Sequence, residues 1–177
     1  MRTAIDQDAI DCLVRHCRMY LYGTSGSPEI RVNEVASDFF SFALLHLTAT
    51  MFITTDHREG PEGVFHRLLD PAGLSNWVRP IDRVLASPLG RTNLKAFIRV
   101  KRNKMATHGA LAWRDQPAEV QAVTFDERAL NEYRELMEQL DEEVRVLHGK
   151  LDRLTKTSRP IASRVLSARS RPRATEG

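Results

Sequence analysis

Cysteine is scarce in this sequence, which has only Cys12 and Cys17. The two lie five positions apart on a segment with helical periodicity, a spacing that does not suit a disulfide within one helix. Cys12 and His16 could share a metal ion, but no second ligand pair is evident, and two cysteines cannot form a zinc ribbon. We therefore expect a chain of the reducing cytoplasm, without disulfides and with no metal site.

Long apolar runs are also missing. The longest run without a charged residue spans 17 residues, 39–55, and contains His46 and five serines and threonines. A transmembrane helix needs about 20 predominantly apolar residues. The first six residues include an aspartate and have no apolar signal-peptide region. These features predict no membrane association.

Several sequence patterns that mark catalytic and cofactor sites are absent. The chain has no glycine-rich phosphate loop, no cluster of His, Asp and Glu at metal-ligand spacing, no Gly-x-Ser-x-Gly elbow and no internal repeat. No run alternates convincingly between apolar and polar residues, which argues against a sheet. We expect no cofactor and an all-α fold.

Helical periodicity covers most of the chain. Apolar residues recur at three- and four-residue steps over about 3–22, 28–55 and 74–86, with a short helix over 64–69. Pro80 predicts a kink or a start within the third of these segments. The pattern favours an up-and-down bundle of four to six helices that occupies residues 1–157.

The most regular apolar pattern predicts a long C-terminal helix. Thr124 and Glu127 fit a capping box at its start. The pattern then forms a heptad seam, made of Leu130, Tyr133, Met137, Leu140, Val144, Leu147, Leu151 and Leu154. The seam could join two copies of the chain or a partner, or it could belong to the longest helix of an antiparallel bundle, and both can hold if the far end overhangs the core.

Positive charge gathers in two places. Residues 158–177 hold five arginines and one glutamate and few apolar residues, which predicts a disordered basic tail. Residues 83–114 hold eight Lys and Arg and no acid. Such a segment attracts polyanions such as RNA. Much of it should form a helix that begins after Ser87 and Pro88 and carries the candidate RNA-binding residues Lys95, Arg99, Lys101 and Lys104.

One histidine in the basic segment has an arginine six positions before it. Of the six histidines, only His108 has an arginine five to seven positions upstream, and that residue is Arg102. Arginine binds phosphate oxygens in a bidentate fork, and histidine transfers protons near neutral pH. Six helical residues turn about 600°, which leaves the two side chains about 120° apart. They converge if the helix ends at His108 or if a second subunit supplies its copy. This split geometry and the heptad seam together favour a homodimer.

The arrangement Arg102-Asn103-(four residues)-His108 resembles the Arg-x(4–6)-His motif of HEPN domains. The adjoining Lys104, Ala106 and Thr107 resemble variants found in phage-defence abortive-infection proteins. The resemblance implies a helical domain over about residues 3–156, whose two copies line one cleft in a dimer. It also implies a metal-independent endoribonuclease of a toxin–antitoxin or phage-defence system, with a possible antitoxin partner of nucleotidyltransferase type.

The resemblance further implies roles for the motif residues. His108 would act as general base or acid, Arg102 would stabilise the phosphorane-like transition state, and Asn103 would orient the phosphate or the histidine. Some HEPN domains only bind RNA. The alternative function is a non-catalytic helical module that binds RNA or protein and dimerises through the 130–154 seam. A solvated basic helix with an incidental histidine at its end is the simplest interpretation.

Overall fold

The computed structural model describes residues 5–24, 34–53, 63–103, 118–124 and 126–169. These ranges are mostly helical, which confirms the all-α class. They contain seven α-helices, more than the four to six predicted, because several short helices connect the long ones. The helices are α1 (Gln7–Thr24), α3 (Glu34–Phe52), α4 (Val64–Leu69), α5 (Arg79–Ala86), α6 (Leu94–Arg102), α7 (Ala118–Thr124) and α8 (Glu127–Arg169), with a 3₁₀ turn η1 (Ser75–Trp77) before α5.

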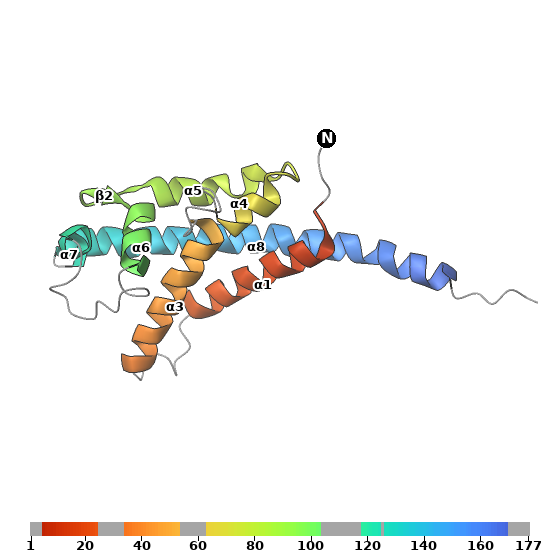
Figure 1. Cartoon of the computed structure of the whole chain (residues 1–177), viewed down its shortest axis with the longest axis horizontal. Helices are drawn as coiled ribbons and strands as arrows, with labels where there is room; N and C mark the ends of the chain where they lie inside the picture. Colours follow the sequence, from red (N-terminus) through yellow and green to blue (C-terminus); the bar gives the residue numbers. More distant parts are fainter. Residues whose placement is uncertain (1–4, 25–33, 54–62, 104–117, 125, 170–177) are drawn as a thin grey trace, which may run out of the picture.

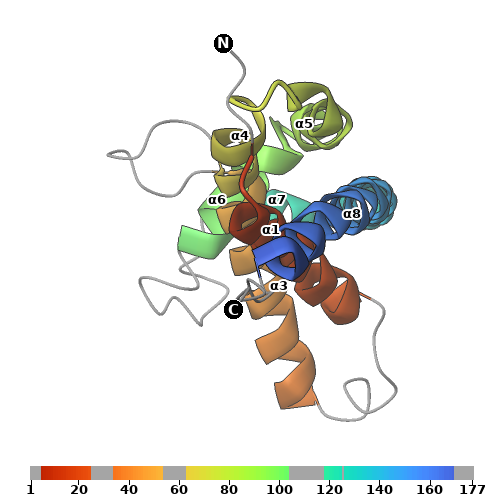
Figure 2. The same cartoon turned by 90° about the vertical axis from the view of Figure 1, so that its right-hand side faces the viewer.

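Helix α8 is the central element of the fold (Figure 1). Helices α1, α5 and α7 pack along it, and the view along its length shows α1 and α5 on different sides of it (Figure 2). Its buried residues include Leu140, Val144, Leu147 and Leu151, four members of the heptad seam. The chain's own core therefore covers this part of the seam, as expected of the longest helix of a bundle. Because these four residues are buried within the chain, they are not exposed to contact a second copy, which was the competing interpretation of the seam.

Both ends of α8 differ from the prediction. The N-cap is Asp126, whose Oδ1 accepts hydrogen bonds from the backbone N–H groups of Arg128 (2.9 Å) and Ala129 (3.3 Å). The predicted cap, Thr124, is instead the last residue of α7. At the other end the helix continues to Arg169, so the predicted tail from Ser158 is helical over its first twelve residues. Arginine, alanine and leucine are good helix formers, and extending an existing helix costs little.

Helix α1 runs antiparallel to α8. Its start lies near Thr155, and at its end the Thr24 hydroxyl donates a hydrogen bond to Asp141. Its buried face consists of Ile10, Leu13, Val14, Cys17 and Tyr20. Burial raises the pKa of the Cys17 thiol to about 12, so this cysteine stays protonated. Cys12 and Cys17 are both free thiols, as the sequence predicts.

A small hairpin joins α5 to α6. Pro88 and Leu89 pair antiparallel with Asn93 and Thr92, and Gly90 has a φ of +56° that favours glycine in the turn. Helix α6 therefore begins at Leu94, and the predicted start after Ser87 and Pro88 is wrong. The expectation of no sheet is also wrong at this hairpin, because strands of two residues are too short to show a period.

The end of α3 and the start of α4 approach each other closely. A Cβ atom at Gly63 would overlap the backbone of Met51 and Phe52, so this contact requires glycine. The rings of Phe52 and Phe65 then pack with their centroids 5.0 Å apart. Pro80 lies in the first turn of α5. Of the two predicted alternatives at this proline, a kink or a helix start, the helix start is therefore correct. Among the described helices, none has both the length and the apolar character that a membrane crossing requires.

Candidate nucleic-acid interface

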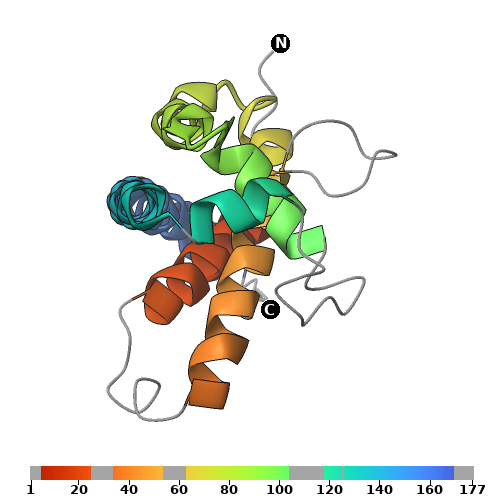
Figure 3. The same cartoon turned by 90° about the vertical axis from the view of Figure 1, so that its left-hand side faces the viewer.

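Helix α6 carries most of the described candidate residues, and its apolar residues determine which side of the helix faces the core. The Asn93 side chain caps it by accepting a hydrogen bond from the backbone N–H of Ala96 at 2.8 Å. Leu94, Phe97 and Ile98 are buried, in a part of the fold where α6 packs against α3, α5 and α7 (Figure 3). Because these apolar residues face inward, the basic residues of the helix occupy its remaining sides.

Three cations share one side of α6. Lys95, Arg99 and Arg102 are spaced at i, i+4 and i+7, so they lie in a row that spans about 10 Å along the axis. We call these three residues the basic face. Lys95 and Arg99 are exposed, and Arg102 is half-buried. Within the described ranges no carboxylate forms an ion pair with any of the three.

Arg102 is the least exposed residue of the basic face. Its Nε and Nη1 atoms are shielded from solvent and have no hydrogen-bond partner among the described residues. Burial lowers the pKa of Arg102 from its usual value. A desolvated N–H donor without an acceptor costs free energy, and a phosphate oxygen would supply that acceptor. Arg102 thus keeps donor capacity that the described fold does not use, and an anion reaches Nε and Nη1 only after the atoms that cover them move aside.

Asn103 continues the helical backbone beyond Arg102. Its N–H donates to the carbonyl oxygens of Arg99 and Val100, and its φ and ψ are −62° and −41°. The helical turn that carries Arg102 is therefore intact at its C-terminal side. Lys104 and His108, the other two candidates of the motif, lie outside the described residues.

Lys101 differs from the basic face in its surroundings. Its Nζ lies 5.6 Å from the ring centroid of Phe97 and 5.8 Å from that of Tyr133 on α8. The two rings pack against each other with centroids 5.2 Å apart. Burial lowers the pKa of Lys101. The structure thus places this candidate in a cation–π contact between α6 and α8, apart from the row of Lys95, Arg99 and Arg102.

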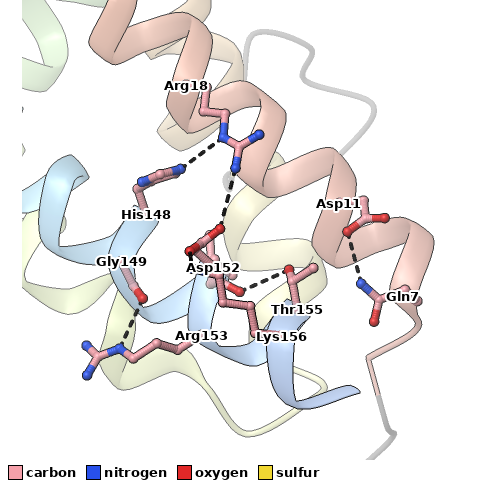
Figure 4. A network of polar contacts seen from close by, with 10 residues as sticks. Gln7, Asp11, Arg18, His148, Gly149, Asp152, Arg153, Thr155 and Lys156 are labelled. Carbon is pink, nitrogen blue, oxygen red and sulfur yellow. Dashed lines mark hydrogen bonds and ion pairs between the residues drawn. The ribbon is translucent and has the colours of Figure 1, made fainter. Parts of the chain in front are cut away.

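A polar network links α1 and α8, and no pattern in the sequence predicted it (Figure 4). Arg18 Nε donates to His148 Nε2 at 3.3 Å, and Arg18 Nη2 lies 3.4 Å from Asp152 Oδ1. Lys156 Nζ lies 2.6 Å from the other oxygen of Asp152. Arg18 and His148 are 130 residues apart in the chain, so no local spacing could reveal the pair.

The described residues offer no metal centre, since no three His, Cys, Asp or Glu side chains among them are grouped to hold an ion. Comparison of the chain with models of protein families, with curated proteins and with solved structures found no match. The resemblance to HEPN domains therefore continues to rest on the motif at 102–108 and on the helical character of the chain.

Proposed function

We propose that this chain is a HEPN-like, metal-independent endoribonuclease that acts as a homodimer. The observation that carries the proposal is the guanidinium of Arg102, whose Nε and Nη1 atoms are shielded from solvent and have no partner in the described part of the chain. Arginine is the side chain best suited to bidentate contact with phosphate. The same arginine begins the HEPN-like motif that ends at His108.

The basic face supports a polymeric anion as the ligand. Lys95 and Arg99 extend the positive charge of Arg102 over about 10 Å of α6, which suits a strand that contacts several phosphates in succession. No acidic residue interrupts the sequence between Arg83 and Arg114. Binding should therefore weaken as salt increases, by a factor that depends on the number of phosphates contacted.

The proposed reaction is an attack of the RNA 2′-OH on the adjacent phosphorus. His108 takes the proton of the 2′-OH as the 2′-O–P bond forms, and the His108 of the second subunit protonates the 5′-oxygen as the P–O5′ bond breaks. Arg102 stabilises the negative charge of the phosphorane-like transition state, and Asn103 orients the phosphate or the histidine. Lys104 would lower the pKa of His108 by like-charge repulsion, whereas a helix C-terminus would raise it.

The homodimer and the biological role belong to the same proposal. The angle of about 120° between Arg102 and His108 on an ideal helix favours a site completed by two subunits. Because α8 buries Leu140, Val144, Leu147 and Leu151 within its own chain, we place the dimer contact near the motif instead of along these seam residues. By the same resemblance, we propose that the chain is a toxin or phage-defence effector of the cytoplasm, with an antitoxin of nucleotidyltransferase type.

A labelled RNA pool incubated with the full chain in EDTA tests this function. We expect cleavage to persist in EDTA, to yield 2′,3′-cyclic phosphate ends and to spare a DNA of the same sequence. Cleavage of the DNA at a similar rate would contradict the mechanism, because DNA lacks the 2′-OH. Loss of RNA cleavage in EDTA would contradict the metal-independent step.

Non-catalytic RNA binding is the second candidate. Lys95 and Arg99 are exposed cations without an ion-pair partner among the described residues, and both could bind RNA without any proton transfer at His108. In the same assay this function predicts salt-sensitive RNA binding and intact RNA. A module that dimerises through the 130–154 seam is a weaker candidate, because four seam residues are buried in the core.

A further inference from the structure

A hollow of about 400 Å³ lies where η1 meets the C-terminal half of α8. Trp77 and Leu154 form the apolar part of its lining, and the rest is lined by Lys150, Arg153 and Thr157. Trp77 and Leu154 also pack against the core, and each is half-buried. Part of an indole and part of a leucine side chain therefore lie together at the surface, an arrangement that suits contact with an apolar group of a partner.

The apolar surface continues onto the preceding turn of α8. Val146 is 42% exposed, and it lies four residues before Lys150 and seven before Arg153, so all three share one side of the helix. An exposed valine beside an aromatic hollow adds to the apolar area that a partner would remove from water. We define the docking surface as the group made up of Trp77, Val146, Lys150, Arg153 and Leu154.

The polar groups of the hollow are positively charged. Lys150 and Arg153 both line it, none of its lining residues is acidic, and within the described ranges no carboxylate forms an ion pair with either cation. Arg153 Nε donates a hydrogen bond to the carbonyl oxygen of Gly149 at 3.1 Å. Figure 4 shows Arg153 on the side of α8 away from Arg18. The docking surface is thus separate from the network between α1 and α8.

The charge of α8 changes sign along the helix. Residues 127–143 contain seven acids and two arginines, whereas residues 145–157 contain four Lys and Arg and one acid. The docking surface lies in the positive part. A negatively charged partner is attracted to this part and repelled by the other, so the charge pattern selects both the sign of the partner and its position along α8.

We propose that the docking surface binds an acidic segment of another protein. One apolar side chain of the segment contacts Trp77 and Leu154, and its carboxylates lie beside Lys150 and Arg153. An apolar centre with a charged rim is typical of protein interfaces, whereas an RNA strand is best bound by several cations in succession. The docking surface lies on η1 and α8 and not on α6, so this proposal does not depend on the proposed ribonuclease activity.

Tryptophan fluorescence of the full chain tests the proposal. The only other tryptophan is Trp113, so Trp113→Phe leaves Trp77 as the sole reporter. The probe is a short labelled peptide of glutamate and leucine residues, and two matched peptides replace every glutamate by lysine or every leucine by serine. The acidic peptide should bind and shift the emission of Trp77 to shorter wavelength, because it covers the indole. Both matched peptides should bind about tenfold or more weakly.

Charge reversal on α8 tests the position of the peptide, with binding measured from the anisotropy of its label. Lys150→Glu and Arg153→Glu should each weaken binding by about tenfold or more, because they set like charge against the carboxylates. Arg134→Glu is the matched control, since Arg134 is an exposed cation of α8 that does not line the hollow. Trp77→Ala should also weaken binding, and the two charge variants decide the result if Trp77→Ala does not fold.

Five results would overturn the proposal. The first three are no binding of the acidic peptide at millimolar concentration, unchanged Trp77 emission when the peptide is saturating, and equal binding by Lys150→Glu and Arg134→Glu when both melt as the wild type does. Displacement of the peptide by a short RNA, together with weaker RNA binding by Lys150→Glu, would assign the surface to RNA. A shift of Trp77 emission that grows with the concentration of the chain alone would assign it to a second copy.

Discussion

Arg18 of α1 and His148 of α8 form a hydrogen bond in which Arg18 Nε donates to His148 Nε2 across 3.3 Å (Figure 4). Because the imidazole accepts at Nε2, it is neutral, with its proton on Nδ1. Asp152 and Lys156 complete the charged groups of this network, so protonated His148 would face two cations and one carboxylate. The pair joins the first described helix to the last and makes their contact sensitive to acid.

The stability of the protein should fall as the pH drops below about 6.5, the ordinary pKa of histidine. Burial, followed by the charge of Arg18, lowers the pKa of His148 in the folded chain, and Lys156 adds to this while Asp152 opposes it. The unfolded state therefore takes up the proton first, and stability is lost from pH 6.5 down to the lower folded pKa. Thermal unfolding between pH 8 and pH 5 measures the slope, which His148→Gln should flatten. His46→Gln, a change at an exposed residue of α3, should keep the wild-type slope. Equal slopes in His148→Gln and wild type would refute the account.

The neighbours Leu147 and Val146 test whether the heptad seam belongs to the core. Leu147 is fully buried, whereas Val146 is 42% exposed on the same turn of α8. Leu147→Ala should lower the free energy of unfolding by about 2–5 kcal/mol, and Val146→Ala by less than about 1 kcal/mol. Urea unfolding measures both. If Leu147→Ala instead left stability unchanged and altered only self-association, the seam would be an intermolecular contact.

Helical periodicity predicted α1 and α8 well, because each of these helices buries one continuous stripe of apolar residues. It failed where structure depends on only a few residues. The two-residue strands of the hairpin are too short for a period, and Asp126 rather than Thr124 caps α8 because α7 ends at Thr124. Helix α7 lies outside the segments for which periodicity predicted a helix. Of the candidate site, the sequence predicted the basic face of α6, whereas the setting of Lys101 and the Arg18–His148 pair depend on contacts between segments far apart in the chain.

Lys101 and Lys95 should respond differently to substitution by alanine. Lys101 packs over Phe97 and Tyr133, so Lys101→Ala loses a cation–π contact and the apolar stem, and should destabilise the fold by about 1 kcal/mol. Lys95→Ala changes an exposed residue and should leave stability within about 0.5 kcal/mol while weakening RNA binding. Urea unfolding and filter binding of a labelled RNA separate the two effects. If Lys101→Ala left stability unchanged while Lys95→Ala lowered it, the aromatic contact would not stabilise the packing of α6 on α8.

Removal of residues 158–177 should leave the stability of the domain nearly unchanged. Thr155 is the last residue of α8 among the described buried residues, so the melting temperature should change by no more than a few degrees. The truncation removes five arginines and one glutamate, and the salt dependence of RNA binding should become shallower. Thermal melting and binding at several salt concentrations measure these effects. A large drop in melting temperature would mean that the segment packs on the domain.

The most direct test of the proposed function compares RNA cleavage by wild type, Arg102→Ala, His108→Ala and the control Arg91→Ala, which changes an exposed arginine outside the motif. In EDTA, His108→Ala should lower the cleavage rate by about 10²–10⁴, the range for a lost acid–base group. Arg102→Ala should weaken both cleavage and RNA binding, and Arg91→Ala should cleave at nearly the wild-type rate. All three variants should keep the wild-type melting temperature within a few degrees. Equal cleavage by His108→Ala and wild type would contradict the catalytic assignment of the motif.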